Sequence, residues 1–244
     1  MKTNRFWMAM AVSCWAGCGA PATTTDEPAL ASESSSLDND SSNPQLFGVD
    51  SHPYGISTKE WAFNWFRWIH SIPAATNPAI VAGVDYNQHQ IGPVYFVPTG
   101  PNHNDTFTLP RHKAMAIMLT QVSNDYPCPD PTPKPAPGQS VFDFLSTDLT
   151  KFNDSITVLE VALDGKPIVE PLKYRYTSSR LFYFVGDKSL AASFDTCVTG
   201  SPQPAVADDL FIIFKPLSRG QHVLVTHIVN ADGVFDRTRT ITTE

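Results

Sequence analysis

The chain has 244 residues, of which 42% are hydrophobic and 17% charged, which is typical of a globular protein with one domain, or one domain and a tail. Its formal net charge of −7 argues against a nucleic-acid partner, because binding phosphates requires clustered lysines and arginines, and the sequence has no such cluster. An acidic surface is equally compatible with a soluble exported protein.

The amino terminus has the pattern of an export signal. Lys2 and Arg5 precede a short apolar run over residues 6–12, which is too short to span a bilayer as a helix. We therefore interpret residues 1–17 as a signal peptide.

The residues that follow indicate a lipid anchor. Ala16-Gly17-Cys18 resembles the end of a bacterial lipobox, although Trp15 occupies a position that is usually aliphatic. We expect Cys18 to be lipidated and to attach the protein to a membrane, with ordinary secretion as the alternative. Gly19 in place of aspartate after the cysteine favours the outer membrane or cell surface.

Residues 18–46 carry almost no side chains that could be buried. They are rich in Ser, Thr, Ala, Pro and acidic residues, which is typical of a disordered segment. Such a tether has a root-mean-square reach of roughly 30 Å. We therefore predict a single folded domain over residues 47–244.

The clearest helical pattern of the chain covers residues 57–73. Ser57 and Glu60 form a capping-box pattern, in which each side chain can satisfy a backbone N–H of the first turn, and Pro73 marks the end. This stretch therefore predicts a helix.

One side of this helix is strongly aromatic. At the helical period it carries Trp61, Trp65, Trp68 and Ile72, and the opposite side carries Glu60, Asn64, Arg67 and Ser71. Three tryptophans on one stripe bury enough area to anchor a domain. We interpret them as core residues; the alternative is a tryptophan platform for sugar rings or a peptide.

After the helix the pattern changes to short strands separated by Gly, Pro, Asp and Ser. The expected strands cover residues 92–98, 105–109, 113–122, 156–163, 167–169, 174–176, 181–185, 210–214, 222–230 and 234–242. Helix is the rival interpretation for 113–122. Asp164-Gly165 predicts a type I′ hairpin turn. The fold class is therefore mainly β, an antiparallel β-sandwich of immunoglobulin-like or jelly-roll-like type with one amphipathic N-terminal helix packed on it.

The cysteines indicate an oxidising compartment. Loss of Cys14 with the signal peptide and lipidation of Cys18 leave Cys128 and Cys197, which can pair. On the chain-entropy model a bridge across so long a loop stabilises the fold by about 4 kcal/mol. Alternating prolines over residues 127–137 predict an extended, polyproline-like arm.

Several short motifs carry a family resemblance. They are Tyr54-Gly55, the Trp61, Trp65 and Trp68 stripe, Ile72-Pro73, Asn77-Pro78, Gln90-x-Gly92-Pro93-Val94-Tyr95-Phe96, Leu163-Asp164-Gly165, Tyr174-Arg175-Tyr176, Cys197-x-Thr199-Gly200 and Pro216-Leu217-Ser218-x-Gly220-x-His222. Together they resemble a family of uncharacterised secreted bacterial proteins over most of residues 54–244, and the last resembles the final hairpin of bacterial immunoglobulin-like domains. The resemblance implies no activity. It also implies a further cysteine pair near Tyr86 and Phe107, which this chain lacks.

No metal site is expected. His89, His103 and His112 lie in loops without ligand spacing, and no H-x-H or H-E-x-x-H motif is present. His227 shares a strand face with Val223, Val225 and Val229, which predicts a hydrogen-bonded core histidine.

The acidic residues show no catalytic spacing. The candidates for hydrolysis are Glu60, Asp85, Glu160, Glu170, Asp208 and Asp209. We assign Glu60 to the helix cap and interpret Asp208 and Asp209 as turn acids before a strand. Two catalytic carboxylates can be distant in sequence and come together only on folding, so the absence of a characteristic spacing leaves a catalytic pair as an open alternative.

Two functions from different classes follow. The first is a surface-tethered or secreted binding or structural module for a glycan or protein, with Trp61, Trp65, Trp68, Arg67 and Arg175 as candidate ligand contacts. The alternative is an extracellular hydrolase or lyase acting on a polysaccharide or cell-wall substrate. No cofactor is expected in either case.

Overall fold

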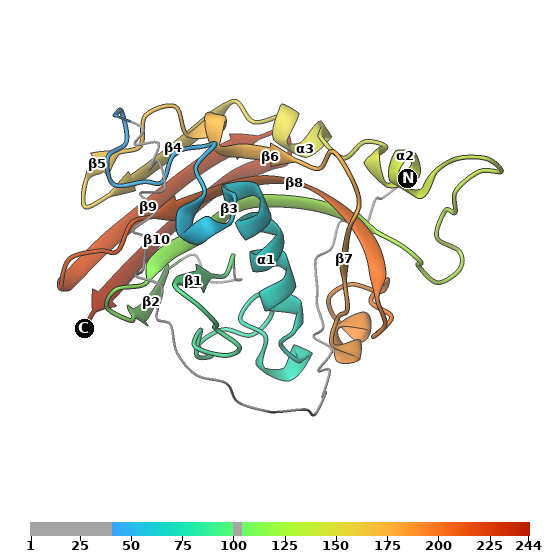
Figure 1. Cartoon of the computed structure of the whole chain (residues 1–244), viewed down its shortest axis with the longest axis horizontal. Helices are drawn as coiled ribbons and strands as arrows, with labels where there is room; N and C mark the ends of the chain where they lie inside the picture. Colours follow the sequence, from blue (N-terminus) through green and yellow to red (C-terminus); the bar gives the residue numbers. More distant parts are fainter. Residues whose placement is uncertain (1–40, 100–103) are drawn as a thin grey trace, which may run out of the picture.

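The computed structural model describes residues 41–99 and 104–244 and shows two β-sheets and one long helix (Figure 1). Sheet A contains β1 (Val94–Val97), β3 (Ala114–Asp125), β8 (Gln203–Phe214) and β6 (Arg175–Thr177) in that order, with β7 (Phe182–Phe184) also paired to β8. Sheet B contains β2 (Asn104–Leu109), β10 (Gly233–Thr243), β9 (Gly220–Asn230), β4 (Val158–Leu163) and β5 (Lys166–Pro167). The predicted mainly β sandwich with a helix is confirmed.

The pairing is antiparallel except at one edge of each sheet. The edge strands β1 and β2 run parallel to β3 and β10, respectively. Both sheets are therefore mixed, whereas the sequence pattern predicted a wholly antiparallel sandwich. Alternation of side chains marks a strand but carries no information on the direction of its neighbour.

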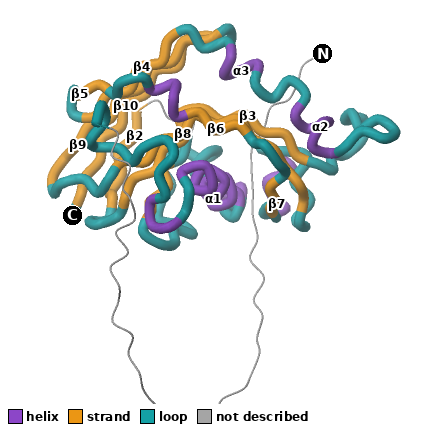
Figure 2. The backbone as a smooth tube through the Cα atoms, turned by 45° about the horizontal axis from the view of Figure 1, so that its top comes forward, coloured by secondary structure: helices purple, strands orange, loops and turns teal. Residues whose placement is uncertain are grey.

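The helices lie on both sides of sheet A. Helix α1 (Thr58–His70) lies in the hollow of the curved strands β3 and β8, and α2 (Val141–Ser146) and α3 (Lys151–Asp154) lie on the outer side of the curve (Figures 1 and 2). The 3₁₀ turns within the described ranges are η1 (Pro53–Gly55), η2 (Ala74–Thr76), η3 (Pro171–Tyr174) and η4 (Lys188–Ala192). No helix in the described ranges has the length and apolar character needed to cross a membrane.

The start of α1 follows the predicted capping pattern in part. The Ser57 hydroxyl accepts a hydrogen bond from the Glu60 N–H at 3.2 Å. The Glu60 carboxylate, however, accepts from Arg67 Nη1 at 2.5 Å, two turns further along the helix. Glu60 therefore supports the helix through an ion pair along its surface.

The tryptophan stripe is buried between α1 and the sheet. Trp61, Trp65 and Trp68 are 6%, 0% and 4% exposed, as the core interpretation predicts. Each indole N–H donates to a backbone carbonyl, of Pro53, Val97 and Gln88, at 2.8, 2.8 and 2.7 Å. The one polar atom of each ring is thus satisfied without water.

Sheet A is the middle layer, with α1 on one face and sheet B on the other. Neighbouring side chains of β1 point to opposite faces. The ring of Phe96 packs against Trp61 and Trp68, while Tyr95 stacks on Phe107 of sheet B with centroids 6.1 Å apart. The main hydrophobic core therefore has two layers, one on each face of sheet A.

Strand β8 begins seven residues before the predicted start at residue 210. Asp208 and Asp209, interpreted as turn acids, lie in the middle of this strand and are fully buried, so that interpretation is wrong. Arg175, Thr177 and Asn153 bond Asp208 there, which the sequence pattern does not reveal. Asp209 has no hydrogen-bond partner on either oxygen among the described residues. Helices α2 and α3 were also missed, since each is shorter than two turns.

The inner face of β9 is the opposite of the predicted one. Leu224 and Ile228 point into the core, whereas Val223 and Val225 are 37% and 42% exposed. His227 lies on this solvent side and bonds Asp236 at 2.6 Å, so the expected core histidine is wrong. Both faces of β9 carry β-branched residues, and the alternation alone therefore does not select one.

Two other boundaries are informative. Asp164 and Gly165 have φ angles of 53° and 72°, which the predicted type I′ turn requires. Asn43 is buried and its side-chain amide donates to the Val169 carbonyl and to Tyr174, so the packed body begins inside the predicted tether. The predicted signal peptide and the predicted lipidation site Cys18 lie outside the described residues.

We expect Trp65→Ala to lower the free energy of unfolding by about 3–5 kcal/mol, because it leaves a large cavity under α1 and an unpaired Val97 carbonyl. Urea denaturation followed by circular dichroism measures the loss. The control is Tyr183→Ala, which removes a ring that is 59% exposed and should change stability little. Equal effects of the two substitutions would contradict the core assignment.

Candidate functional site

The predicted ligand residues do not form one surface. The three tryptophan rings are inside the protein and cannot act as an open platform in this structure. Arg67 bonds Glu60 and Asn64 on α1. Arg175 lies on the other face of sheet A, so the two arginines do not converge.

Arg175 belongs to a satisfied polar network. Its guanidinium contacts the fully buried Asp208 carboxylate through Nε at 2.9 Å and Nη2 at 2.8 Å, and Asp154 through Nη1 at 2.8 Å. Thr177 and Asn153 donate to the same Asp208 carboxylate at 2.6 and 2.8 Å. This network connects α3 to the sheet and has a structural role.

The predicted loop histidines remain separate. His89 bonds the Ser71 hydroxyl at 2.7 Å, His112 lies in a turn with φ of 73°, and His103 is outside the described residues. A different histidine is notable: His70 on α1 is fully buried, stacked on Phe66, with no hydrogen-bond partner on either ring nitrogen among the described residues. Burial holds the pKa of His70 well below its ordinary value.

The predicted disulfide is present. Cys128 and Cys197 are bonded, with Cα atoms 4.2 Å apart, and they join the segment after β3 to the segment before β8. Together with Asp125 they form the one group of three potential metal ligands in the described ranges. Both sulfur atoms are in the disulfide, however, so the oxidised protein offers only the carboxylate.

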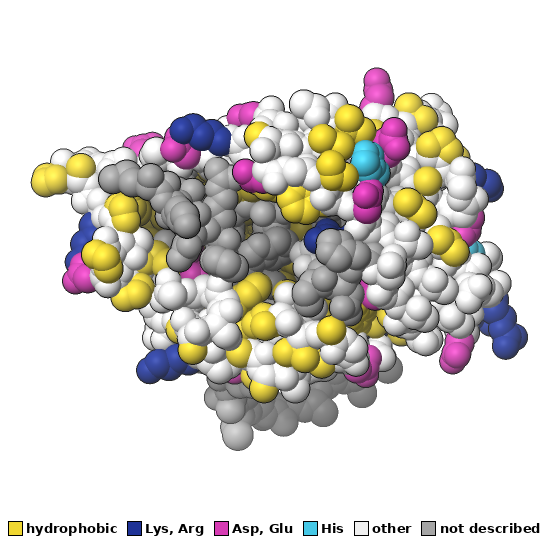
Figure 3. All heavy atoms as spheres, turned by 180° about the vertical axis from the view of Figure 1, so that it is seen from behind, with side chains coloured by type: hydrophobic (Ala, Val, Ile, Leu, Met, Phe, Trp, Pro, Cys, Tyr) yellow, Lys and Arg dark blue, Asp and Glu magenta, His cyan; other side chains and the backbone are white. Residues whose placement is uncertain are grey.

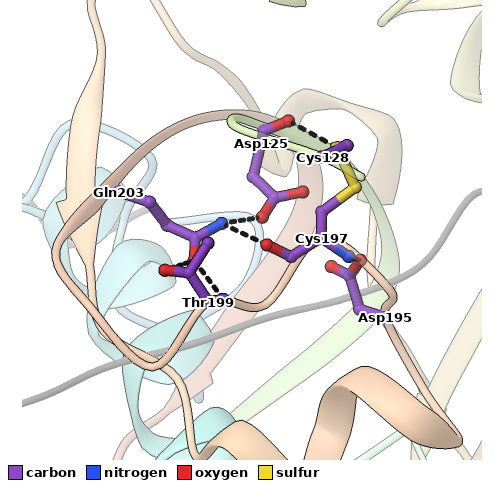
Figure 4. The surroundings of a disulfide bond; sticks show 6 residues. All are labelled: Asp125, Cys128, Asp195, Cys197, Thr199 and Gln203. Atoms are coloured by element: carbon purple, nitrogen blue, oxygen red, sulfur yellow. Dashed lines mark hydrogen bonds between the residues drawn. A yellow bond between two sulfur atoms is a disulfide. The ribbon is translucent and has the colours of Figure 1, made fainter. Parts of the chain in front are cut away.

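Two buried carboxyl groups flank this disulfide (Figure 4). Asp125 accepts a short hydrogen bond from Gln203 Nε2, whose amide also donates to the Cys197 carbonyl at 3.0 Å. Asp195 accepts from the Cys197 N–H at 2.8 Å through one oxygen, and its other oxygen has no partner among the described residues. The two acids thus hold the loop that carries Cys197.

Both acids favour the protonated form. Burial, together with the charge of Asp195, raises the pKa of Asp125 well above its ordinary value. Burial raises the pKa of Asp195 to about 7. Raised carboxyl pKa values often mark functional sites, but Asp125 and Asp195 are only 8% and 5% exposed. Because both carboxyl groups are buried, we expect their protonation to affect the free energy of unfolding rather than to serve catalysis.

A second unusual group lies on the inner face of sheet B. Arg239 is 2% exposed, and its Nε contacts both oxygens of Asp105 at 3.1 and 3.2 Å. Its Nη2 donates to the Pro98 carbonyl at 2.6 Å, and Tyr86 donates to Asp105 at 2.6 Å. Arg237, two residues earlier on the same face, is partly buried beside this group. The alternation along the strand could have predicted that both arginines point inward, because they are an even number of residues from Phe235 and Ile241 on the same face.

Two aromatic rings pack together between the loop after α1 and strand β2. Tyr86 and Phe107 pack with ring centroids 5.4 Å apart. Elsewhere the exposed charges are mixed: acidic and basic side chains are interspersed over the face in Figure 3. Such a surface offers no basic stripe for nucleic acid on that face.

Comparison with known proteins adds little. No family model and no curated protein matches the chain. Among solved structures, the solution structure of Amebosin is similar over 59% of this chain and 99% of that chain, at 8% identity and a TM-score of 0.18. A score this low carries no argument about fold or function.

We expect Asp195→Asn to gain stability relative to the natural protein as the pH rises from 4 to 8. Between the ordinary carboxyl pKa and about pH 7 the unfolded chain has released the Asp195 proton while the folded protein still holds it, so the stability of the natural protein falls as the pH rises through this range and levels off above it. Asparagine does not titrate, and its neutrality also relieves Asp125. Urea unfolding at several pH values measures the difference.

The control for this experiment is Asp232→Asn, which removes an exposed carboxylate from the β9–β10 turn. A stability difference between Asp195→Asn and the natural protein that stays constant with pH would contradict the assignment.

Proposed function

We propose that this chain is an exported binding module, anchored through Cys18, that recognises a neutral glycan with the outer face of sheet B. The proposal is supported chiefly by the side chains of that face. They are Thr106 and Thr108 on β2, Thr238, Thr240 and Thr242 on β10, and Val223 and Val225 on β9. We call these residues the threonine-valine face.

Strand register arranges this face in rows. Thr106 lies beside Thr240, which lies beside Val223, and Thr238 lies beside Val225 in the next row. Neighbouring strands are about 4.8 Å apart, and same-face residues are about 6.7 Å apart along a strand. Side chains therefore repeat in two directions, which suits a repeating polymer better than a compact ligand.

The chemistry of the face suits a sugar chain. A threonine offers a hydroxyl that donates and accepts, together with a methyl group, and a sugar ring offers hydroxyls and C–H surfaces. Exposed valines, up to 58% at Val234, add apolar contact at the solvent side of the sheet. The outward positions of the described strands β2, β4, β9 and β10 carry no lysine or arginine, which favours a neutral ligand over an acidic one.

The hydrolase or lyase alternative has less support. The carboxyl groups with raised pKa values are Asp125, Asp195 and Asp209, and all three are buried. Catalysis would require an acid within reach of a substrate. The resemblance to secreted bacterial proteins is compatible with a binding module but supplies no activity.

We expect the natural protein to be retained on an insoluble neutral polysaccharide such as cellulose or chitin, and Val225→Glu to lose this retention, because a charge enters the middle of the threonine-valine face. Co-sedimentation measures it. The matched control is Val169→Glu, at a residue that is 45% exposed, close to the 42% of Val225, but away from that face. Equal retention of both variants, or none for the natural protein, would overturn the glycan proposal.

The anchor has a separate test. Cys18→Ala should move the protein from the membrane fraction to the soluble fraction, because the proposed lipid can no longer be attached. Immunoblotting of fractionated cells measures the distribution. Unchanged membrane association of the variant would exclude Cys18 as the anchor.

A further inference from the structure

A charge imbalance lies on the inner face of β10, on the side opposite the outward threonines. Every second residue of this strand points inward. Among these residues Ile241 is fully buried and Phe235 packs on the core. Arg237 and Arg239 are also among them. Two guanidinium groups therefore enter a mostly apolar layer.

The charge of Arg239 is fully accounted for. Asp105 neutralises it through two contacts, and the Pro98 carbonyl accepts its Nη2. The Asp105 carboxylate is only 6% exposed and is further held by Tyr86. One positive and one negative charge therefore cancel in this pair.

The charge of Arg237 is not accounted for. Among the described residues no carboxylate forms an ion pair with it and no acceptor forms a hydrogen bond with it. Burial and the nearby Arg239 lower the pKa of Arg237 to about 10, while Asp105 acts in the opposite direction. Arg237 nevertheless stays protonated at neutral pH, so this layer carries one excess positive charge.

An unpaired, partly buried charge is costly, and a bound anion removes that cost. The Arg237 side chain is only partly buried, so that part of it is accessible to solvent.

We propose that Arg237 is the centre of a binding site for a carboxylate group of a ligand. A carboxylate matches the single excess charge and accepts two parallel hydrogen bonds from one guanidinium. The site is on the inner face of sheet B and does not depend on the glycan proposal, which concerns the outer face.

The test measures the melting temperature of the natural protein in increasing sodium acetate at pH 7, against sodium chloride at equal ionic strength. Acetate should raise the melting temperature in a saturating manner, because it binds the folded state only. Arg237→Gln should abolish this rise. Arg219→Gln, which removes an exposed arginine, should behave as the natural protein does.

Two outcomes would overturn the proposal. One is an equal response to acetate and chloride in the natural protein, or an acetate response that Arg237→Gln retains. The other comes from stability without acetate: the melting temperature of Arg237→Gln should equal or exceed that of the natural protein, because an unpaired charge is removed. A marked drop would show that Arg237 already has a partner within the fold.

Discussion

The structure depends on the burial of the aromatic side of α1 in the hollow of sheet A. A large curved sheet has two apolar faces, and the residues of β3 and β8 are buried on both. Sheet B and the short helices cover one face, and α1 covers the other. Without the tryptophans and phenylalanines of α1, the hollow face of the sheet would be exposed to water.

This constraint explains why the helix and most strands could be predicted. The spacing of Trp61, Trp65 and Trp68 reflects direct contact with one surface, and burial follows from the periodicity itself. The predicted start of the hairpin at Asp164 also follows from local chemistry, since few residues accept a positive φ. The folded region was predicted from the change in composition after residue 46, and the disulfide from the two cysteines that remain in that region.

Other features could not be predicted because they depend on distant partners. Asp208 fits in the middle of a strand only because Arg175, Thr177 and Asn153 meet it there. His227 was placed in the core because both faces of β9 have similar composition. The acids around the disulfide and Arg237 are unusual because they are buried or partly buried. Their burial depends on how the strands pair, which the sequence pattern does not show. The sequence kept Trp61 and Arg175 as candidate ligand contacts beside the core interpretation of the tryptophans, whereas in the structure Trp61 is buried and Arg175 bonds Asp208.

The disulfide also affects how the two longest strands find their alignment. Cys128 follows the end of β3, and Cys197 precedes the start of β8, so the two cysteines meet at one end of an antiparallel pair of strands that are twelve residues long. A slip of one residue would turn every side chain of the moving strand to the opposite face and separate the sulfur atoms. Oxidation therefore selects the native alignment, including the irregularity between Met118 and Thr120, over shifted alternatives. The disulfide therefore helps to specify the register of sheet A as well as its stability.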